Sequence, residues 1–306
     1  MRLFEKTITE KETGWTAEQV LRRSLGLSTT RIKRAKFRPD GILLDGVRIN
    51  TVQQVRLGQH LELHLPELEE NCLESAPGAM DIIYEDEWLL AVDKPAGLPV
   101  HPGPGHYADT LGNRLAGYYR QRGKELVFRP VNRLDKGTSG LMLCAKRAES
   151  HEALQNLLHT DEFQRDYLAL LSRAPRPPKG TVDTPIAPVP GALNCYRTDP
   201  AGKTAKTDYV TLQSRPDGAL VQLRLRTGRT HQIRVHMASI HHPVAGDPVY
   251  GPHNCITSLH GQCLHAKTLG FVHPITGEHL RFDSELPDYF TRFLTTLRQR
   301  TGGNNE

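Results

Sequence analysis

The sequence lacks the patterns that mark membrane and secreted proteins. No apolar run approaches the length of a membrane span, and the segment MRLFEKTITEKETGW at the start has neither an apolar signal core nor an arginine-rich amphipathic pattern. The cysteines number 5, an odd count without a Cys-x-x-Cys pair, which argues against a full disulfide framework. We therefore expect reduced thiols and a cytoplasmic protein.

Motifs for metal and nucleotide binding are also absent. His231 and His236 do not share one helical face, and no His-Glu-x-x-His occurs, so we expect no metal. Gly202-Lys203-Thr204 imitates the end of a phosphate-binding loop, but Arg197 stands where that loop requires its first glycine. We expect no cofactor, and no internal repeat or low-complexity tract is apparent.

Length and charge allow an enzyme that acts on a polyanion. The 306 residues, of which 38% are hydrophobic, can form one large catalytic domain with a small appendage. Lys and Arg total 39 against 34 Asp and Glu, which gives a net charge of +5 and a pI near 8.9. This modest basicity is compatible with nucleic acid, although many metabolic enzymes are equally basic.

The first residues predict a small module of two helices and a short sheet. Thr16 and Gln19 have the spacing of a capping box at the start of a helix. A second helix can begin after residues 28–30, with Ile32 and Ala35 packing inward. That second helix is strongly basic, and its charged residues are Arg31, Lys33, Arg34, Lys36 and Arg38.

A hairpin and a linker follow the basic helix. Residues 42–44 and 47–49 flank an Asp45-Gly46 turn, and residues 60–65 alternate as a strand does. Residues 66–79 are acidic, contain prolines and show no periodicity, which is typical of a flexible linker. We therefore divide the chain into a module at 1–65, a linker at 66–79, a catalytic domain at 80–298 and a disordered tail at 299–306.

The larger part of the chain mixes strand and helix signals, which indicates an α+β domain. Residues 82–84, 89–92 and 221–225 are strand candidates, and a helix is expected after Gly228. We expect residues 174–191 to form a proline-rich loop.

One segment has the composition of a catalytic loop. Residues 133–140 read Arg-Leu-Asp-Lys-Gly-Thr-Ser-Gly, and an apolar stretch follows at 141–145. An acid between two bases, followed by two glycines, suits neither a core nor a helix. It suits a loop that aims the carboxylate of Asp135.

This loop resembles the signature of the RluA-type pseudouridine synthases, in which Arg-Leu-Asp followed by Thr-Ser-Gly carries the nucleophilic or basic aspartate. The family usually has His where this chain has Asn132. Residues 84–103 and 226–251 are similar to the first and third motifs of the same family, and the match covers roughly residues 81–290. The N-terminal module resembles the RNA-binding domain named after ribosomal protein S-four.

The resemblance implies a fold and a reaction. The fold would be a pseudouridine-synthase fold: a mixed, mostly antiparallel sheet of about eight strands, with flanking helices around a central cleft, plus a small N-terminal α/β domain. The enzyme would isomerise specific uridines of structured RNA to pseudouridine, without a cofactor. The aspartate could attack the sugar, add to the base ring or take a ribose proton, and all three routes stay open.

The resemblance also implies roles for individual residues. Asp135 would be the catalytic carboxylate, held ionised by an arginine, and we favour Arg229 over Arg234 for that pairing. Tyr167 would stack on the extruded uracil. Arg133 would hold a phosphate or fill the gap left by the extruded nucleotide.

The partner is expected to be RNA, bound by a monomeric protein. Arg31, Lys33, Arg34 and Arg48 would follow the phosphates. Large-subunit ribosomal RNA is favoured as the substrate, and transfer RNA stays open. Two other functions are compatible with parts of the sequence: a non-catalytic RNA-binding or ribosome-associated protein, and an aspartyl-phosphate transferase, which would need further acids around Mg²⁺.

Overall fold

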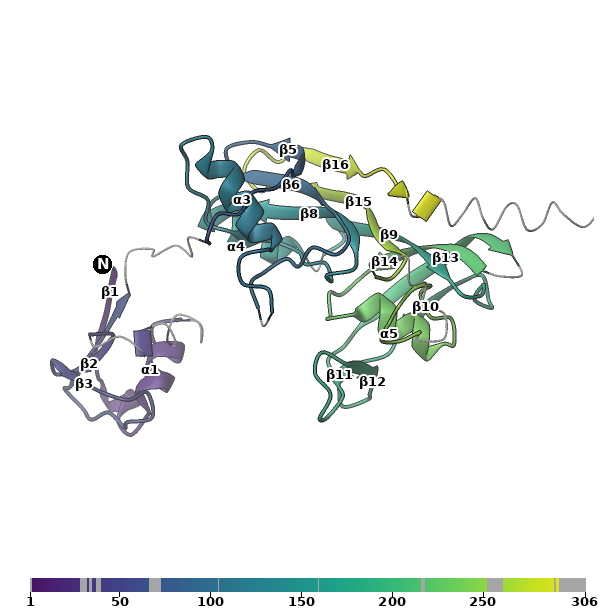
Figure 1. Cartoon of the computed structure of the whole chain (residues 1–306). Coiled ribbons are helices and arrows are strands. Elements are labelled where there is room, and N and C mark those ends of the chain that lie inside the picture. Colours follow the sequence, from purple (N-terminus) through teal and green to yellow (C-terminus); the bar gives the residue numbers. More distant parts are fainter. Residues whose placement is uncertain are drawn as a thin grey trace, which may run out of the picture. The chain divides into compact units, whose positions relative to one another are not determined.

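The structure is a computed structural model, and the residues that it describes are 2–27, 32, 35–36, 40–65, 73–103, 105–158, 160–215, 218–251, 261–288 and 290–291. The chain forms two compact units, Met1–Asn71 and Cys72–Glu306 (Figure 1). Within the described residues, no helix is long and apolar enough to cross a membrane.

The N-terminal unit packs a small helix pair against a four-stranded sheet. The strand order is β1 (Arg2–Thr7), β4 (His60–Leu65), β2 (Ile42–Leu44) and β3 (Val47–Arg48). A 3-10 helix, η1 (Glu10–Glu12), precedes helix α1 (Ala17–Arg23). The predicted capping box is confirmed, because the Thr16 hydroxyl accepts from the Gln19 N–H and the Gln19 amide oxygen accepts from the Thr16 N–H.

The predicted hairpin and inward-facing residues are confirmed as well. Asp45 and Gly46 have φ of 51° and 77°, the left-handed pair that a tight two-residue hairpin turn requires. Ile32 and Ala35 are buried in the core of this unit. Most of the predicted basic helix, including Arg31, Lys33 and Arg34, lies outside the described residues.

The larger unit is built on one ten-stranded sheet. Its order is β10 (Lys179–Asp183), β13 (Lys206–Arg215), β14 (Gly218–Leu225), β9 (Phe163–Leu171), β15 (Leu264–Val272), β8 (Ser139–Ala145), β6 (Leu89–Lys94) and β5 (Asp81–Glu85), with β16 (His279–Asp283) on β15 and β7 (Arg129–Pro130) on β8. Among the described strand pairs only β8 and β15 run parallel, so the predicted mixed and mostly antiparallel sheet is confirmed.

Helices cover both faces of this sheet at the β8 end. Every residue of β8 is buried, and alternate side chains belong to two different cores. Met142 packs in the core that contains Leu111 and Leu115 of α3 (Leu111–Arg120), whereas Leu143 packs with Leu154 of α4 (Ala148–Leu157). Helix α5 (Gln232–Ser239) lies at the other end of the sheet beside β13 (Figure 1).

The prediction that residues 174–191 form a loop is wrong in part. Residues Lys179–Asp183 form β10, and Ile186–Pro188 form β11, which pairs with β12 (Tyr196–Thr198). Among the described strands, β10 pairs only with β13, at the edge of the sheet. An edge strand tolerates adjacent prolines, because one row of its N–H groups has no ladder partner to satisfy.

Candidate active site

Asp135 lies on the loop between β7 and β8, as the sequence predicts. Its backbone carbonyl accepts from the Thr138 N–H at 3.0 Å, which closes a tight turn. The Thr138 hydroxyl accepts in turn from the Gln262 amide at 2.7 Å, and this links the loop to the segment before β15. The loop is therefore held from both sides, and the Asp135 side chain, 24% exposed, remains accessible.

Two glycines of this loop are required by close backbone contacts. A Cβ on Gly137 would lie 3.0 Å from Cα of Gly261 and 2.7 Å from the Gln262 amide oxygen. Gly140 has a φ of +106°, and a Cβ there would lie 2.3 Å from the carbonyl oxygen of Ala266 on β15. Larger residues at either position would push the carboxylate loop away from β15.

The cation beside Asp135 is Arg234, on the first turn of α5. Its Nη1 donates to Asp135 Oδ2 at 3.0 Å. Its Nε and Nη2 donate to the two oxygens of Asp247 at 2.7 and 2.8 Å, a bidentate pair. One buried guanidinium therefore joins a fully buried carboxylate to a partly exposed one.

Asp247 is ionised despite its burial. Burial opposes its charge, but the hydrogen bonds and charge of Arg234 outweigh that effect and hold the pKa of the Asp247 carboxyl below its usual range. The backbone N–H groups of Val249 and Tyr250 also donate to it, at 2.9 and 3.1 Å. Asp247 thus fixes the direction in which Arg234 presents its remaining donor.

The predicted pairing of Asp135 with Arg229 is wrong. The Nε of Arg229 donates to the Thr204 carbonyl at 2.9 Å, while Arg234 holds Asp135. The backbone explains why Arg234, and not Arg229, pairs with Asp135. His231 has a left-handed φ of 56° and separates the loop that carries Arg229 from the helix that carries Arg234. The two arginine side chains therefore extend into different surroundings.

Lys94 is a buried residue near the site that sequence reasoning did not assign. Its side chain is fully buried, and its ammonium donates to the carbonyls of Pro95, Leu98 and Lys136 at 2.9, 2.9 and 3.2 Å. Burial lowers the pKa of Lys94 to about 7, and the charge of Asp135 opposes the shift. The carbonyl of Lys136 also accepts from the Gly97 N–H at 2.8 Å, so two donors fix the residue next to Asp135.

Tyr167 is buried in the main core of the larger unit. It lies on β9, opposite Leu223 of β14 and Ala266 of β15, and is only 4% exposed. Burial raises the pKa of the Tyr167 hydroxyl, the Arg165 charge opposes this, and the Asp135 charge adds to it. The structure thus brings Tyr167 within electrostatic reach of Asp135.

Arg133 is exposed on the loop that carries Asp135. Its charge acts together with burial to lower the pKa of His101 and of His231, two rings on other segments of the site. The neighbouring Asn132, where the family usually has His, is buried and accepts from the Leu143 N–H at 2.8 Å, so it anchors the loop to β8.

The remaining predicted site residues lie in the N-terminal unit. Arg48 is exposed on β3, and its Nη2 lies 3.4 Å from the Lys36 carbonyl, on the segment of the predicted basic helix. Arg31, Lys33 and Arg34 fall outside the described residues.

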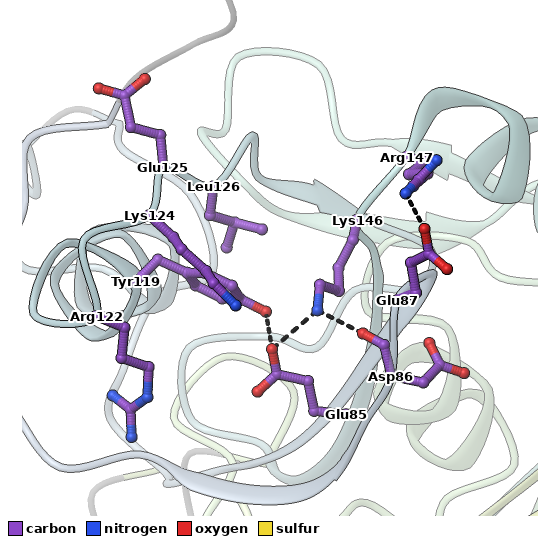
Figure 2. Close-up of a pocket in the computed structure, with 10 residues that line it drawn as sticks. All are labelled: Glu85, Asp86, Glu87, Tyr119, Arg122, Lys124, Glu125, Leu126, Lys146 and Arg147. Atoms are coloured by element: carbon purple, nitrogen blue, oxygen red, sulfur yellow. Dashed lines mark hydrogen bonds and ion pairs between the residues drawn. The ribbon is translucent and has the colours of Figure 1, made fainter.

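An open hollow of about 880 Å³ lies elsewhere in the larger unit (Figure 2). Its wall includes Glu85, Tyr119 and Lys146, and the carboxylate of Glu85 accepts from both of the others at 2.6 and 2.9 Å. These residues lie at the Leu89–Ala145 end of the β6–β8 pair, whereas Asp135 lies beyond the opposite end. Because a strand rises about 3.3 Å per residue, the two places are about 20 Å apart. The hollow is therefore separate from the carboxylate site.

Two residues of the site were missed by sequence reasoning, Asp247 and Lys94. The signal for Asp247 was weak, because one acid among Gly, Pro and Tyr is typical of a turn. Lys94 stands at the end of an apolar run and before a proline, where a lysine is usually solvated. In the described part of the chain no cluster of three or more His, Cys, Asp or Glu side chains could hold a metal ion.

Comparison with known proteins identifies the family. Residues 88–239 match the family model described as RNA pseudouridylate synthase. The chain is 39% identical to a Bacillus subtilis protein named uncharacterized RNA pseudouridine synthase YlyB, over 84% of this chain and 86% of the relative. It is 40% identical to ribosomal large subunit pseudouridine synthase D of Zymomonas mobilis, over 74% of this chain and 75% of the relative.

A solved structure agrees with these relatives. The human protein called RNA pseudouridylate synthase domain containing 4 superposes with a TM-score of 0.58 at 29% identity, and the match covers 71% of this chain and 93% of the human one. The alternative of an aspartyl-phosphate transferase is set aside by these similarities. The chain belongs to the RluA-type RNA pseudouridine synthases, isomerases that convert uridine in RNA to pseudouridine.

Proposed function

We propose that Asp135 is the carboxylate that performs the isomerisation and that Arg234 keeps it ionised and aimed. The observation that carries the proposal is the 3.0 Å hydrogen bond from Arg234 Nη1 to Asp135 Oδ2, made by a guanidinium that Asp247 already holds. Attack on the sugar, addition to the base ring and removal of a ribose proton all require an ionised carboxylate of fixed direction. The pair provides that common requirement.

Tyr167 and Arg133 would hold the target nucleotide. Tyr167 is buried on β9, where the charge of Asp135 acts on it, and its ring would stack on the extruded uracil, an interaction that contributes about 1 to 3 kcal/mol. Arg133 is exposed beside the loop and would bind a backbone phosphate or occupy the gap that the nucleotide leaves. The role of Arg133 follows from its charge and its position two residues before Asp135, and the role of Tyr167 follows from its aromatic ring.

The N-terminal unit would add affinity for structured RNA. Its helix and hairpin order is similar to the S-four type of RNA-binding domain, and the basic residues Arg31, Lys33, Arg34 and Arg48 would contact phosphates. Each such contact displaces a counterion, so binding would weaken steeply with salt. The unit could not specify the uridine by charge alone, since phosphate contacts carry no sequence information.

Large-subunit ribosomal RNA is the proposed substrate, and the protein is proposed to act as a cytoplasmic monomer. The support is similarity to a relative named ribosomal large subunit pseudouridine synthase D, together with the basic N-terminal module. Transfer RNA is the second candidate, because both are structured RNAs with accessible loops.

The test compares two labelled substrates. Unmodified transcripts of large-subunit ribosomal RNA and of transfer RNA, each with tritium at carbon five of uridine, are incubated with the protein. The proposal expects tritium release from the ribosomal transcript and a missing pseudouridine at the same site in cells that lack the gene. Release from transfer RNA alone, with ribosomal RNA unchanged in those cells, would contradict the proposed substrate.

A further inference from the structure

His231 occupies an unusual backbone position beside the reactive carboxylate. It is the N-cap of α5 and has a left-handed φ of 56°, which non-glycine residues rarely adopt. The side chain of Gln232 holds this turn, accepting from the Arg229 N–H at 2.9 Å and donating to the Lys206 carbonyl at 2.9 Å. Strained conformations that the surroundings fix in this way concentrate at functional sites.

The hydrogen bonds around His231 favour a proton on Nε2 of the ring. The Tyr196 N–H donates to the Tyr250 hydroxyl oxygen at 3.0 Å, and that hydroxyl lies 2.8 Å from Nδ1 of His231. Because the hydroxyl oxygen already accepts one hydrogen bond, the arrangement that also uses its hydrogen is donation to Nδ1. We assign this tautomer, in which the neutral ring carries its proton on Nε2.

The ring is neutral near pH 7 because of its surroundings. Burial lowers the pKa of His231, the charge of Asp135 opposes the shift, and Arg234 adds to it. Tyr196 and Tyr250 also pack edge-on against the imidazole, with ring centroids 5.4 and 5.7 Å away. Two aromatic rings and a hydroxyl thus hold one tautomer in one orientation.

The protonated nitrogen lies beside the reactive carboxylate. Nε2 of His231 is 4.0 Å from Oδ2 of Asp135, which is too long for a hydrogen bond, and no described residue accepts a hydrogen bond from this nitrogen. This spacing leaves room for an acceptor atom of a nucleotide to touch the carboxylate and to lie within hydrogen-bond distance of Nε2. The donor therefore lies next to the region where the glycosidic bond must be if Asp135 acts on it.

We propose that His231 is a catalytic residue that donates a hydrogen bond from Nε2 to the 2-oxygen of the target uracil. The inference rests on the assignment of Asp135 as the reactive carboxylate. When the bond between ribose C1′ and uracil N1 breaks, either because an oxygen of Asp135 bonds to C1′ or because Asp135 takes the proton from C2′ to leave a glycal, the electron pair of the broken bond passes to the uracil. Negative charge then spreads to the 2-oxygen. His231 stabilises that charge and keeps its own proton, and Tyr250 serves as a positioning residue that sets the tautomer.

Two substitutions at position 231 separate a donor from a structural role. The amide of Asn lies where Nδ1 lies, so His231→Asn keeps the contact with Tyr250 and tolerates the left-handed backbone well, but it has no donor toward Asp135. His231→Gln places an amide nitrogen near the position of Nε2 and fits this backbone less well. A structural role makes Asn the better substitute, whereas the proposed role makes Gln the better one.

The assay is single-turnover tritium release from a large-subunit ribosomal RNA transcript at saturating protein, or from the transfer RNA transcript if only that one reacts. We expect His231→Asn to fold and bind RNA normally but to react about one hundredfold more slowly. His231→Gln should recover at least tenfold of that loss. A rate for His231→Asn within threefold of the unchanged protein, or an Asn variant faster than the Gln variant, would overturn the proposal.

A modified substrate tests the acceptor atom itself. Sulfur accepts hydrogen bonds weakly, so with 2-thiouridine in the transcript the hundredfold ratio between unchanged protein and His231→Asn should shrink to less than fivefold. An unchanged ratio would exclude the 2-oxygen as the acceptor. Asp135→Asn is assayed alongside: if it stays active, the assignment beneath the proposal fails, and if it is inactive while His231→Asn is fully active, only the role of His231 fails.

Discussion

At the scale of single residues, the site depends on Arg234 and the two carboxylates that it joins. Asp247 is fully buried and receives two guanidinium hydrogen bonds, so Arg234 has a fixed direction before any substrate binds. Its remaining donor meets Asp135, which is partly exposed and accessible to RNA. A carboxylate held in this way needs no reorganisation when the nucleotide arrives.

The first prediction separates Arg234 from Arg229. Arg234→Lys keeps a charge beside buried Asp247 but cannot form the bidentate pair and reach Asp135 as well. We expect the single-turnover rate at saturating RNA to fall about one hundredfold, which corresponds to about 3 kcal/mol. Arg229→Lys is the matched control and should stay within about threefold. Equal losses in the two variants, or a larger loss for Arg229→Lys, would refute the assignment of Arg234.

Sequence reasoning reached Asp135 but not its partner, for a physical reason. The charged loop with its two glycines identified the carboxylate locally, without any knowledge of the fold. The choice between Arg229 and Arg234 depended on where α5 begins and on the left-handed turn at His231, which nothing in the spacing shows. Asp247 was missed because its role appears only when Arg234 is buried against it.

At the scale of elements, the large sheet has a short parallel join, which lies next to the loop that carries Asp135. Strands β8 and β15 pair in parallel through His265 with Ser139 and Ala266 with Gly140. Gly140 lets the two backbones approach, and its loop carries Asp135. The position of the carboxylate relative to β15 therefore depends on this glycine, together with Gly137 and the hydrogen bond from Gln262 to Thr138.

The second prediction concerns this join. Gly140→Ala would place a Cβ 2.3 Å from the Ala266 carbonyl oxygen at a left-handed φ, so we expect a loss of about 3 kcal/mol or more in the free energy of unfolding. Gly277→Ala is the control, because Gly277 also has a left-handed φ of +74° but has nothing within 4 Å of its Cβ position. That variant should lose only about 1 kcal/mol. Urea unfolding measures both, and similar losses would contradict the steric account.

The third prediction concerns acid stability at the junction of η1 and α1. Buried Glu12 accepts from the Ser24 hydroxyl and from the backbone and hydroxyl of Thr9, and these bonds lower its pKa to about 2. A depressed carboxyl pKa stabilises the folded state above the ordinary value of 4.5, and this contribution is lost as the pH falls toward 2.

Glu12→Gln should therefore lower the melting temperature at pH 6 and have a much smaller effect at pH 2.5, when both are measured on the whole chain. Glu10→Gln, an exposed glutamate in the same 3-10 helix, is the control and should change neither value. A Glu12→Gln effect of the same size at both pH values would show that the carboxylate charge does not stabilise this junction.

Elements with a local signal were predicted, and elements that depend on tertiary contacts were not. The capping box at Thr16 and the Asp45-Gly46 turn were predicted from a few neighbouring residues, and the structure has both. Helix α3 was not predicted, since it contains Gly112 and Gly117, which weaken an isolated helix. A Cβ on Gly117 would lie 2.2 Å from the Ala76 carbonyl oxygen, so this glycine allows α3 to approach the segment around Ala76 closely.

At the scale of the whole molecule, the two units indicate two separable tasks. Each unit has buried clusters of its own, and all the residues proposed for chemistry lie in the larger unit. The N-terminal unit, with its basic segment, would contribute affinity for RNA. The division between Asn71 and Cys72 falls inside the linker predicted at 66–79, and the later residues of that stretch, including Glu74 and Ala76, contact α3.

The fourth prediction tests this division. A shortened chain that starts at Cys72 should fold and should release tritium at a normal rate when RNA is saturating. Its affinity should be lower, and the slope of log affinity against log salt should flatten by about 0.9 for each phosphate that the shortened chain no longer binds. A shortened chain that stays inactive at any RNA concentration would show instead that the N-terminal unit completes the active site.

The central claim, that Asp135 is the reactive carboxylate, is tested most directly by single-turnover tritium release from Asp135→Asn at saturating RNA. Asn has the same size and keeps one acceptor for Arg234, so folding and RNA affinity should be nearly unchanged. We predict a rate at least one thousandfold lower, equivalent to about 4 kcal/mol, while the surface control Asp161→Asn reacts normally. An Asp135→Asn protein that keeps a tenth or more of the original rate would contradict the account.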